Sequence, residues 1–322
     1  MPWLAGVDEA GYGPNLGPFV MSLVCLRAPA DLLGADLWQA LAAAIRRAKG
    51  RDDGRLTVDD SKAVYSPARG LATLERNLWP FLCGAACSAR VPLEALWRRC
   101  CLTPWAALAA EPWCEPGVTL PVAAPAAEGV AERCAALDAA FRSAGVELRL
   151  IESVVVFPRQ FNALTAQHNS KAAVPAWALQ QLFGRLPTLG SDEPLSLVAV
   201  DKLGGRNRYG DVLQGAFASG QVLARHESAA QSCYHVHLAA GAWEVRFEVE
   251  ADRRHLPVAL ASMMSKYLRE LLMEQFNRFW QAHVPGLKPT AGYPGDAARF
   301  YAAIRTARER LGIPHEAVWR ER

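Results

Sequence analysis

Residues 3–26 read WLAGVDEAGYGPNLGPFVMSLVCL, and this stretch decides the fold. Its apolar first part ends in two neighbouring acids, Asp8 and Glu9, which are followed by a turn rich in glycine and proline. Its last part, residues 19–26, is rich in valine, leucine and phenylalanine, as β-strands are. The stretch therefore predicts a β-hairpin that carries two carboxylates at the end of its first strand.

Strand-like and helix-like segments alternate along the rest of the chain, which predicts an α/β fold. β-type runs cover residues 148–156 and 195–200, and residues 235–250 alternate like a second hairpin with its turn at 239–241. Helical spacing covers residues 35–48, 66–79, 158–186, 256–280 and 296–311. Residues 83–145 break the alternation with several prolines among alanine, tryptophan and cysteine. We expect an inserted segment there, which either packs locally or shapes a substrate site.

The composition is that of an ordinary globular protein. Of the 322 residues, 51% are hydrophobic and 21% are charged, which excludes a disordered, collagen-like or coiled-coil chain. The net charge of +3 does not by itself indicate a nucleic-acid partner. The apolar runs are too short for a membrane span, and the first residues lack a basic and apolar leader. We therefore expect a cytoplasmic protein with no membrane partner.

Four acids stand where predicted strands end: Asp8, Glu9, Asp201 and Asp252. Side chains leave the core at the edge of a sheet, so acids at such positions can converge. A cluster that offers only oxygen ligands suits Mg²⁺ or Mn²⁺. Two such ions, about 3.5–4 Å apart, would activate a water for phosphodiester hydrolysis. Taken singly, an acid after a strand is more often a turn former or a helix cap, and spacing alone does not show convergence.

Five motifs follow one another along the chain: Gly6–Pro18 in the hairpin turn, Asp60-Ser61-Lys62, Val200-Asp201, Glu250-Ala251-Asp252 with the segment Ala259–Arg269, and Gly292-Tyr293-Pro294. In this order they resemble the motifs of type 2 ribonuclease H (ribonuclease HII). The resemblance implies an α/β fold with a ribonuclease H-like mixed sheet flanked by helices. It places the catalytic core in residues 1–82 and 146–285, the insertion in 83–145, and a C-terminal helical segment near the substrate site in 286–322.

The resemblance also implies the chemistry. Enzymes of this family use divalent metal to cleave the RNA strand of RNA–DNA hybrids or ribonucleotides embedded in DNA, and they leave 3′-hydroxyl and 5′-phosphate ends. The family's catalytic and metal-binding carboxylates match Asp8, Glu9, Asp201 and Asp252. In a two-metal hypothesis Asp8 bridges both ions, Glu9 and Asp201 hold one, and the fourth acid holds the other. The implied cofactor is Mg²⁺ or Mn²⁺, and the implied partner is an RNA–DNA hybrid or a DNA duplex that contains ribonucleotides.

The resemblance further assigns substrate-binding residues. Tyr293 matches the tyrosine that packs against the ribonucleotide and helps to read its 2′-hydroxyl, the group that separates RNA from DNA. Lys62 is expected to contact phosphate. Lys266 and Arg269, three residues apart on a predicted helix, are expected to face phosphate as well.

The turn Gly11-Tyr12-Gly13 departs from the family's usual Gly-Arg-Gly. Its two glycines allow the backbone to approach a sugar or a phosphate closely. With Tyr12 in place of arginine a phosphate contact is lost, and a stacking or hydroxyl contact is its expected replacement. The preference for a single embedded ribonucleotide is therefore left open.

A basic, glycine-containing loop follows Asp201 directly. Its residues Lys202, Arg206 and Arg208 are expected to grip a phosphodiester backbone, with Tyr209 stacking on a base or a sugar. The alternative is a solvated loop without a ligand. Weaker candidates for nucleic-acid contact are Lys171, Arg225 and His226.

Two other functions stay open at this point. A nuclease of the same fold with a different nucleic-acid substrate is favoured if the altered turn and the basic loop have changed the specificity of the site. A non-catalytic module that binds hybrids is disfavoured by the four acids, because clustered acids repel phosphate unless metal neutralises them. Binding that needs no divalent ion would distinguish such a module.

Overall fold

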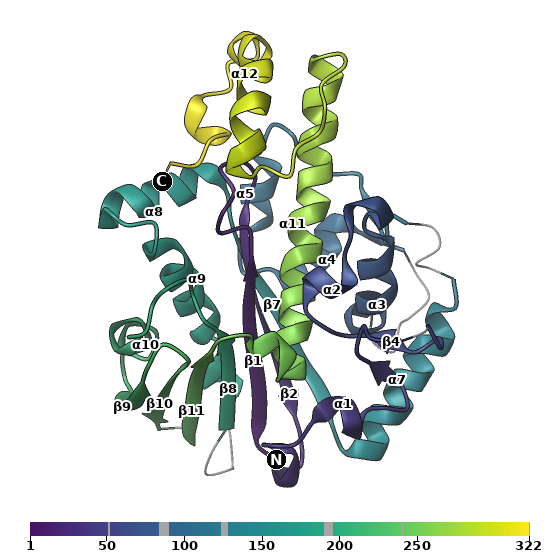
Figure 1. Cartoon of the computed structure of the whole chain (residues 1–322), viewed down its shortest axis with the longest axis vertical. Helices are drawn as coiled ribbons and strands as arrows, with labels where there is room; N and C mark the ends of the chain where they lie inside the picture. Colours follow the sequence, from purple (N-terminus) through teal and green to yellow (C-terminus); the bar gives the residue numbers. More distant parts are fainter. Residues whose placement is uncertain (51, 84–89, 124–127, 190–195, 240, 322) are drawn as a thin grey trace.

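The computed structural model describes residues 1–50, 52–83, 90–123, 128–189, 196–239 and 241–321. A seven-stranded mixed sheet runs through its centre in the order β7-β2-β1-β8-β11-β10-β9 (Figure 1). The strands are β1 (Trp3–Ala10), β2 (Phe19–Arg27), β7 (Glu147–Val156), β8 (Ser196–Asp201), β9 (Gln221–Glu227), β10 (Gln231–Leu238) and β11 (Gly241–Glu248). β1, β8 and β11 run parallel to one another, and the other neighbours pair antiparallel.

Helices cover both faces of this sheet (Figure 1). The helices that the structure describes are α1 (Leu37–Ala40), α2 (Ser61–Val64), α3 (Ala72–Cys83), α4 (Leu93–Cys100), α5 (Trp105–Ala109), α7 (Val130–Ala144), α8 (Pro158–His168), α9 (Ala173–Phe183), α10 (Gly210–Ala216), α11 (Leu256–His283) and α12 (Pro294–Arg310), of which α12 lies beyond the sheet. Short 3₁₀ helices are η1 (Ala30–Leu32), η2 (Pro67–Arg69), η4 (Leu186–Leu189), η5 (Ala251–Arg253) and η6 (His315–Ala317). Two small separate sheets pair β3 (Ile45–Arg46) with β4 (Leu56–Thr57) and β5 (Val91–Pro92) with β6 (Thr119–Leu120).

The long helix α11 lies across β1 and β2 on one face of the sheet (Figure 1). A Cβ atom at Gly6 would lie 2.2 Å from the backbone nitrogen of Val258, so only glycine lets the start of α11 come this close to β1. Farther along the helix, the Ser265 hydroxyl donates to the backbone carbonyl of Asp8 at 3.0 Å and contacts the Ser22 hydroxyl at 2.8 Å. The helix is thereby fixed against the carboxyl end of β1.

The opposite face of the sheet is covered by α8, α9 and α10 (Figure 1). Val7 and Val200 point into the hydrophobic cluster on that side, whereas Leu4 and Leu197 belong to the cluster around α11. Because side chains alternate along a strand, Asp8 and Asp201 face α11. The core thus directs both acids to the same side of the sheet.

The structure confirms the expected α/β class, with a mixed sheet flanked by helices and a helical C-terminal region. Both predicted hairpins form, although position 240 in the second turn lies outside the described residues. Residues 158–186 divide into two main helices at Asn169, whose φ of 45° ends α8. The sequence analysis missed β9, because nearly all side chains of this edge strand are exposed.

Two helix predictions are wrong in part. In residues 35–48 the helix ends at Ala40, because Arg55 donates to the carbonyl of Ala42 at 2.7 Å and Ile45 enters a strand. Tertiary contacts override helical spacing there. In residues 66–79 the α-helix begins only at Ala72, because Gly70 has a φ of 55° that interrupts it.

The described part of the predicted insertion packs onto the main core. The ring of Trp113 lies 6.0 Å from the ring of Phe276 in α11 and 6.0 Å from that of Phe157. Trp97 is buried as well, and its indole donates to the carbonyl of Thr103 at 2.7 Å. These contacts favour the packing interpretation, while the boundaries 83 and 145 stay a prediction.

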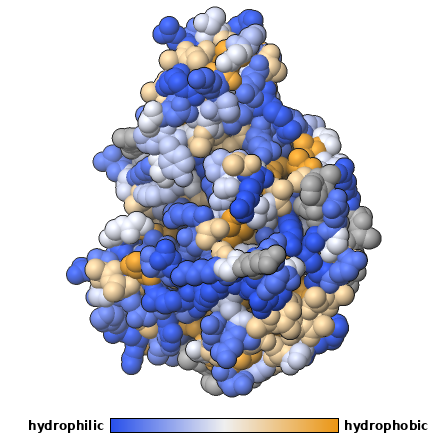
Figure 2. All heavy atoms as spheres, turned by 45° about the vertical axis from the view of Figure 1, so that its right-hand side comes forward, coloured by the Kyte–Doolittle hydropathy of each residue, from blue (hydrophilic) through white to orange (hydrophobic). Residues whose placement is uncertain are grey.

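Apolar side chains gather mainly in the two internal clusters. On the face drawn in Figure 2, hydrophilic residues predominate and hydrophobic residues form small separate groups. Among the residues that the structure describes, no helix is long and apolar enough to cross a lipid bilayer.

Candidate active site

Three parallel strands bring acids to the same edge of the sheet. Val7 on β1 pairs with Val200 on β8, so Asp8 and Asp201 lie at the same level of neighbouring strands. On the other side of β8, Asp201 pairs with Glu248, the last residue of β11. The carboxyl ends of parallel strands meet at one edge, which is where polar side chains can leave the core and converge.

Asp8 and Glu9 are held in a desolvated position at the end of β1. A carboxylate oxygen of Asp8 accepts a hydrogen bond of 2.7 Å from the backbone N–H of Glu9. Burial, and after it the negative charge of Asp201, raises the pKa of Asp8 well above its usual value. The same two causes raise the pKa of Glu9 to about 7. Within the described residues, the buried Oε2 of Glu9 has no hydrogen-bond partner.

Asp201 and Asp252 are linked by the turn that follows β11. Asp201 accepts a hydrogen bond of 2.9 Å from the backbone N–H of Ala251, the first residue of η5. Glu250, with a φ of 55°, turns the chain into η5, so that Asp252 follows beside the end of β8. Burial, then the charges of Asp60 and Asp201, raises the pKa of Asp252 to about 6. The structure therefore brings all four predicted acids together.

The motif Asp60-Ser61-Lys62 supplies a fifth acid and a cation to this cluster. Asp60 caps α2 by accepting from the backbone N–H of Lys62 at 3.0 Å, and the Ser61 hydroxyl contacts that of Ser262 in α11 at 3.1 Å. The Asp60 charge contributes to the raised pKa values of Asp201 and Asp252, whereas Lys62 acts in the opposite direction on both. Sequence reasoning included Asp60 only as part of a motif and missed it as a member of the acid cluster.

The glycine turn after β1 is held by a buried arginine. Arg269 in α11 is 2% exposed, and its guanidinium donates to the carbonyls of Pro18, Leu16 and Ala291. The expectation that Arg269 faces phosphate is therefore wrong. Gly11 has a φ of 89°, and a Cβ atom there would lie 2.7 Å from the Arg269 side chain. The buried arginine side chain thus holds the backbone of the turn in position.

A second buried arginine, Arg320, reaches the same turn from the C-terminal segment. Its guanidinium donates to the carbonyl of Pro14, and its backbone N–H donates to the carbonyl of Asn15 at 2.8 Å. Its positive charge opposes the rise in the pKa of Glu9. The sequence analysis missed Arg320, because no local pattern links it to a turn near the other end of the chain.

Tyr12 and Tyr293 stand on either side of the turn. The Tyr12 ring packs edge-on against Phe19, and the ammonium of Lys171 lies 4.9 Å from its centroid. Tyr293 is 51% exposed and begins α12, and a Cβ atom on Gly13 would lie 3.8 Å from its ring. Four of the predicted substrate-binding residues therefore lie next to one another: Gly11, Tyr12, Gly13 and Tyr293.

The turn is also tied to the start of α12 through its backbone. The N–H groups of Asn15 and Leu16 donate to the carbonyl of Gly292, at 2.8 and 3.2 Å. A side chain at Gly292 would collide with the backbone of Leu16, at 2.5 Å. The glycine turn and the Gly-Tyr-Pro motif are therefore fixed against each other.

The loop after Asp201 is only partly as expected. Lys202 donates to Ser228 at 2.6 Å and to Asn207 at 2.8 Å, so it holds the loop together. Arg206 lies close enough to Tyr12 to oppose the rise in the pKa of that phenol. The Arg208 side chain is 90% exposed and lies 3.8 Å from Glu227. The next residue, Tyr209, does not have its expected role.

Tyr209 does not stack on a ligand. It is fully buried, and its ring stacks on that of Phe247 with the centroids 3.6 Å apart. Its hydroxyl donates to the carbonyl of Arg206 at 2.8 Å. The predicted contact with a base or a sugar is wrong, because the tyrosine is part of the core beneath the loop.

Lys266 lines a cavity beside the acids. It forms an ion pair of 2.6 Å with Glu270, and its ammonium lies 4.6 Å from the Tyr65 ring. The cavity has a volume of about 520 Å³, and Lys62 and Tyr293 also line it. Three of the predicted substrate-binding residues therefore border one hollow.

The acid cluster has the properties of a site for hard divalent cations. Its donors are carboxylate oxygens only, its members raise one another's pKa values, and Glu9 has an unpartnered buried oxygen. Among the described residues, no three of these acids bring oxygens within 4.8 Å of one another. In the described structure the side chains are therefore not arranged around a single ion.

Comparison with known proteins gives similar folds at low sequence identity. No protein-family model and no curated protein matches the chain. The chain is similar to a structure of the PCNA–RNase HII complex from Archaeoglobus fulgidus, with 15% identity over 100% of this chain and 95% of that chain and a TM-score of 0.45. Ribonuclease H2 from Pyrococcus horikoshii OT3 gives 15% identity, coverages of 98% and 92%, and a TM-score of 0.46. Bst-RNase HIII in complex with Mn²⁺ gives 14% identity, coverages of 99% and 66%, and a TM-score of 0.45.

Proposed function

We propose that this chain is a metal-dependent endoribonuclease of the type 2 ribonuclease H class. It hydrolyses the RNA strand of RNA–DNA hybrids, or ribonucleotides embedded in DNA, and leaves 3′-hydroxyl and 5′-phosphate ends. The observation that carries the proposal is the convergence of Asp8, Glu9, Asp201 and Asp252 at the end of three parallel strands. Buried acids that repel one another need a cation before a phosphodiester can approach them.

The four acids would hold Mg²⁺ or Mn²⁺. The charge of Asp8 interacts with the charges of both Glu9 and Asp201, which would suit a ligand shared by two ions. The charge of Asp252 interacts with that of Asp201. Ions bound there would supply a water of lowered pKa for attack and stabilise charge on the leaving oxygen. Lys62 adds a positive charge beside the acids, together with Arg320 and Lys171 near Glu9, which offsets part of their repulsion of a phosphate.

The glycine turn and Tyr293 are the proposed readers of the ribose. Tyr293 exposes its ring next to Gly13, so a sugar that packs on the ring lies against the backbone of the turn. Gly13 carries no side chain, and only the Tyr293 ring comes within 4 Å of its Cβ position, so its backbone is suited to a hydrogen bond with a 2′-hydroxyl. Tyr12 offers a ring to a neighbouring nucleotide in place of an arginine.

The basic groups around the glycine turn and Tyr293 are proposed to bind the phosphodiester backbone. Lys62 and Lys266 line the cavity beside Tyr293, and Arg206 lies on the side of Tyr12. Arg208 is almost fully exposed. Lys202, whose ammonium is bonded within the loop, is proposed to shape the loop rather than to bind phosphate directly.

A panel of labelled duplexes tests the proposal. The duplexes are DNA with one ribonucleotide, DNA with a short ribonucleotide run, a full RNA–DNA hybrid, and all-DNA and all-RNA duplexes, each in Mg²⁺, in Mn²⁺ and in EDTA. We expect cleavage at ribonucleotides that EDTA abolishes. Cleavage of all-DNA or all-RNA duplexes instead would indicate a nuclease of different specificity. Metal-independent binding without cleavage of any duplex would indicate a hybrid-binding module and contradict the proposal.

A further inference from the structure

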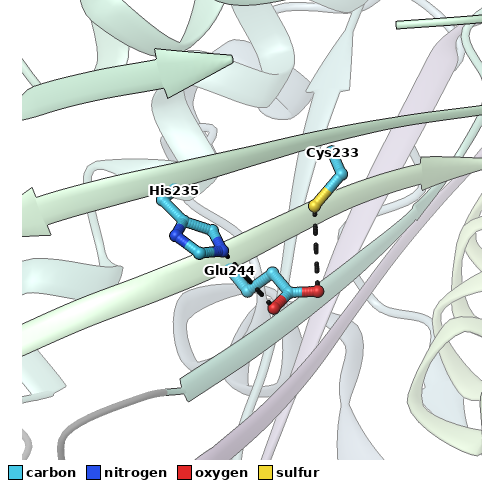
Figure 3. A group of neighbouring side chains, drawn as sticks. All are labelled: Cys233, His235 and Glu244. Atoms are coloured by element: carbon cyan, nitrogen blue, oxygen red, sulfur yellow. Dashed lines mark hydrogen bonds and ion pairs between the residues drawn. The ribbon is translucent and has the colours of Figure 1, made fainter. Parts of the chain in front are cut away.

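A second group of metal-ligand side chains lies on the outer sheet, on the hairpin of β10 and β11. Cys233 and His235 alternate on β10 and therefore point to the same face, while Tyr234 between them is buried in the core. Glu244 on β11 is the direct cross-strand partner of His235. Figure 3 shows the three side chains directed toward one another across the two strands.

One ligand atom from each of the three side chains lies within 4.8 Å of the other two, and two of the separations are close to those around a tetrahedral ion. The Cys233 Sγ lies 3.7 Å from Oε1 of Glu244, and the His235 Nε2 lies 3.6 Å from Oε2. Ligand bonds of about 2.3 Å for sulfur and 2.0–2.2 Å for nitrogen and oxygen give tetrahedral edges of about 3.4–3.6 Å. The His235 nitrogen and the Glu244 oxygen lie farther apart than the partners of a hydrogen bond. The gap between them therefore fits a metal ion better than a hydrogen-bonded proton.

We propose that Cys233, His235 and Glu244 bind a divalent transition-metal ion, with Zn²⁺ as the preferred ion. A thiolate, an imidazole and a carboxylate form the mixed ligand set that zinc takes, and water would fill the fourth position. Mg²⁺ disfavours sulfur and nitrogen ligands, so this site is chemically distinct from the acid cluster. The inference does not depend on the proposed nuclease function.

The surroundings support binding at this position. The side chains of His235 and Glu244 are 32% and 15% exposed, so an ion has access from solvent while the ligands are already partly desolvated. Arg246 pairs with Glu244 and lies opposite Cys233 in the register. It holds the carboxylate in place, as outer hydrogen-bond partners of metal ligands do. On binding, Cys233 releases its thiol proton to solvent.

An ion at this site would join two neighbouring strands of the sheet. β10 and β11 are connected by the turn near residue 240, and the ion would add a cross-link between Cys233 and Glu244 farther along the hairpin. β11 continues to Glu248, the register partner of Asp201. The expected consequence is a more stable outer sheet, measured as a higher melting temperature with one equivalent of zinc.

A titration of the full-length reduced protein with Co²⁺ and Zn²⁺, in excess Mg²⁺, tests the site. Excess Mg²⁺ competes for sites that offer only oxygen ligands, and Co²⁺ reports a cysteine ligand through its thiolate charge-transfer absorption. We expect one equivalent to bind with this absorption and Zn²⁺ to displace it. Cys233→Ser should remove the absorption, and His235→Ala should weaken binding by about 10-fold or more.

Cys114→Ser is the matched control, because Cys114 is another half-buried free thiol outside the hairpin. It should bind like the unmodified protein. A charge-transfer absorption that survives Cys233→Ser, or that disappears in Cys114→Ser, would overturn the assignment. So would the absence of any thiolate absorption in the unmodified protein, with its fold verified by circular dichroism.

Discussion

A Cβ atom on Gly11 would lie 2.7 Å from the Cδ of Arg269 and 2.8 Å from the carbonyl oxygen of Pro18, so the buried arginine in α11 packs where only a glycine leaves room for it. The turn carries Tyr12 and follows directly on Glu9, so this fit positions the proposed reader of the substrate relative to the acids. A buried side chain thereby controls a surface that would contact nucleic acid.

Gly11→Ala is expected to lower both stability and cleavage. The φ of 89° strains any residue with a side chain, and the clashes with the Arg269 side chain and the Pro18 carbonyl add overpacking, for about 2–4 kcal/mol together in the free energy of unfolding. Gly286→Ala is the matched control, because its φ is 77° but no atom lies within 4 Å of the added carbon. Urea unfolding of both variants measures the difference. Equal losses of stability would contradict the role of Arg269.

Metal-free protein is expected to become less stable as the pH rises from about 4 to about 7. The pKa of Glu9 is raised to about 7 and that of Asp252 to about 6, so the folded state binds protons more tightly than the unfolded state does. This contribution is complete below the unfolded pKa and is lost as the pH rises through the folded pKa. Thermal unfolding in EDTA across this range measures the effect.

Glu9→Gln should stabilise the metal-free protein at pH 8, by on the order of 1–3 kcal/mol, while it weakens metal binding and cleavage. Added Mg²⁺ should raise the melting temperature of the unmodified protein more than that of the variant. A variant that is less stable than the unmodified protein in EDTA would show that the Glu9 charge is compensated within the chain.

Asp60→Asn is expected to raise the Mg²⁺ concentration that gives half-maximal cleavage. Asparagine caps a helix as well as aspartate does, so the substitution removes a charge near Asp201 and Asp252 and leaves α2 in place. We expect an increase of about 10-fold, equivalent to about 1.4 kcal/mol of lost electrostatic attraction. An unchanged Mg²⁺ requirement, with unchanged stability, would exclude Asp60 from the metal environment.

Tyr12→Ala is expected to weaken the binding of RNA–DNA hybrid by about 5- to 150-fold, the range of a lost stack on one base. Tyr12→Phe retains the ring and should bind nearly as well, which separates stacking from a contact of the hydroxyl. Fluorescence anisotropy in Ca²⁺ or with an inactive variant measures binding without cleavage. Full affinity of the alanine variant would remove Tyr12 from the substrate site.

The sequence predicts the acids better than it predicts what surrounds them. The local pattern predicts that Asp8 and Asp201 each end an apolar strand, whereas the pairing of β1 with β8 that brings them together is seen only in the structure. Arginine and tyrosine are residue types that often bind ligands. Arg269 and Tyr209 are nevertheless both buried, because of contacts with distant segments. The spacing of residues along the chain does not show whether an arginine will bind a phosphate of a ligand or a backbone carbonyl of the protein itself.

Contacts between segments far apart in the sequence explain the remaining omissions. Arg320 reaches Pro14 from the other end of the chain. The group of Cys233, His235 and Glu244 depends on the register of a hairpin, which sets Glu244 opposite His235. A shift of the register by one residue would turn the donors of one strand to the other face, so the sequence alone does not predict this group.

The most direct test of the central claim is the cleavage rate of the Asp8→Asn variant on a hybrid duplex in Mg²⁺, beside the unmodified protein and Asp211→Asn. Asp211 is an exposed acid of α10 and serves as the matched control. We predict that the unmodified protein and Asp211→Asn cut the duplex at ribonucleotides, and that Asp8→Asn is slower by about 10³-fold or more, with its fold retained. Full cleavage by Asp8→Asn would contradict the assignment of the acid cluster as the catalytic metal site.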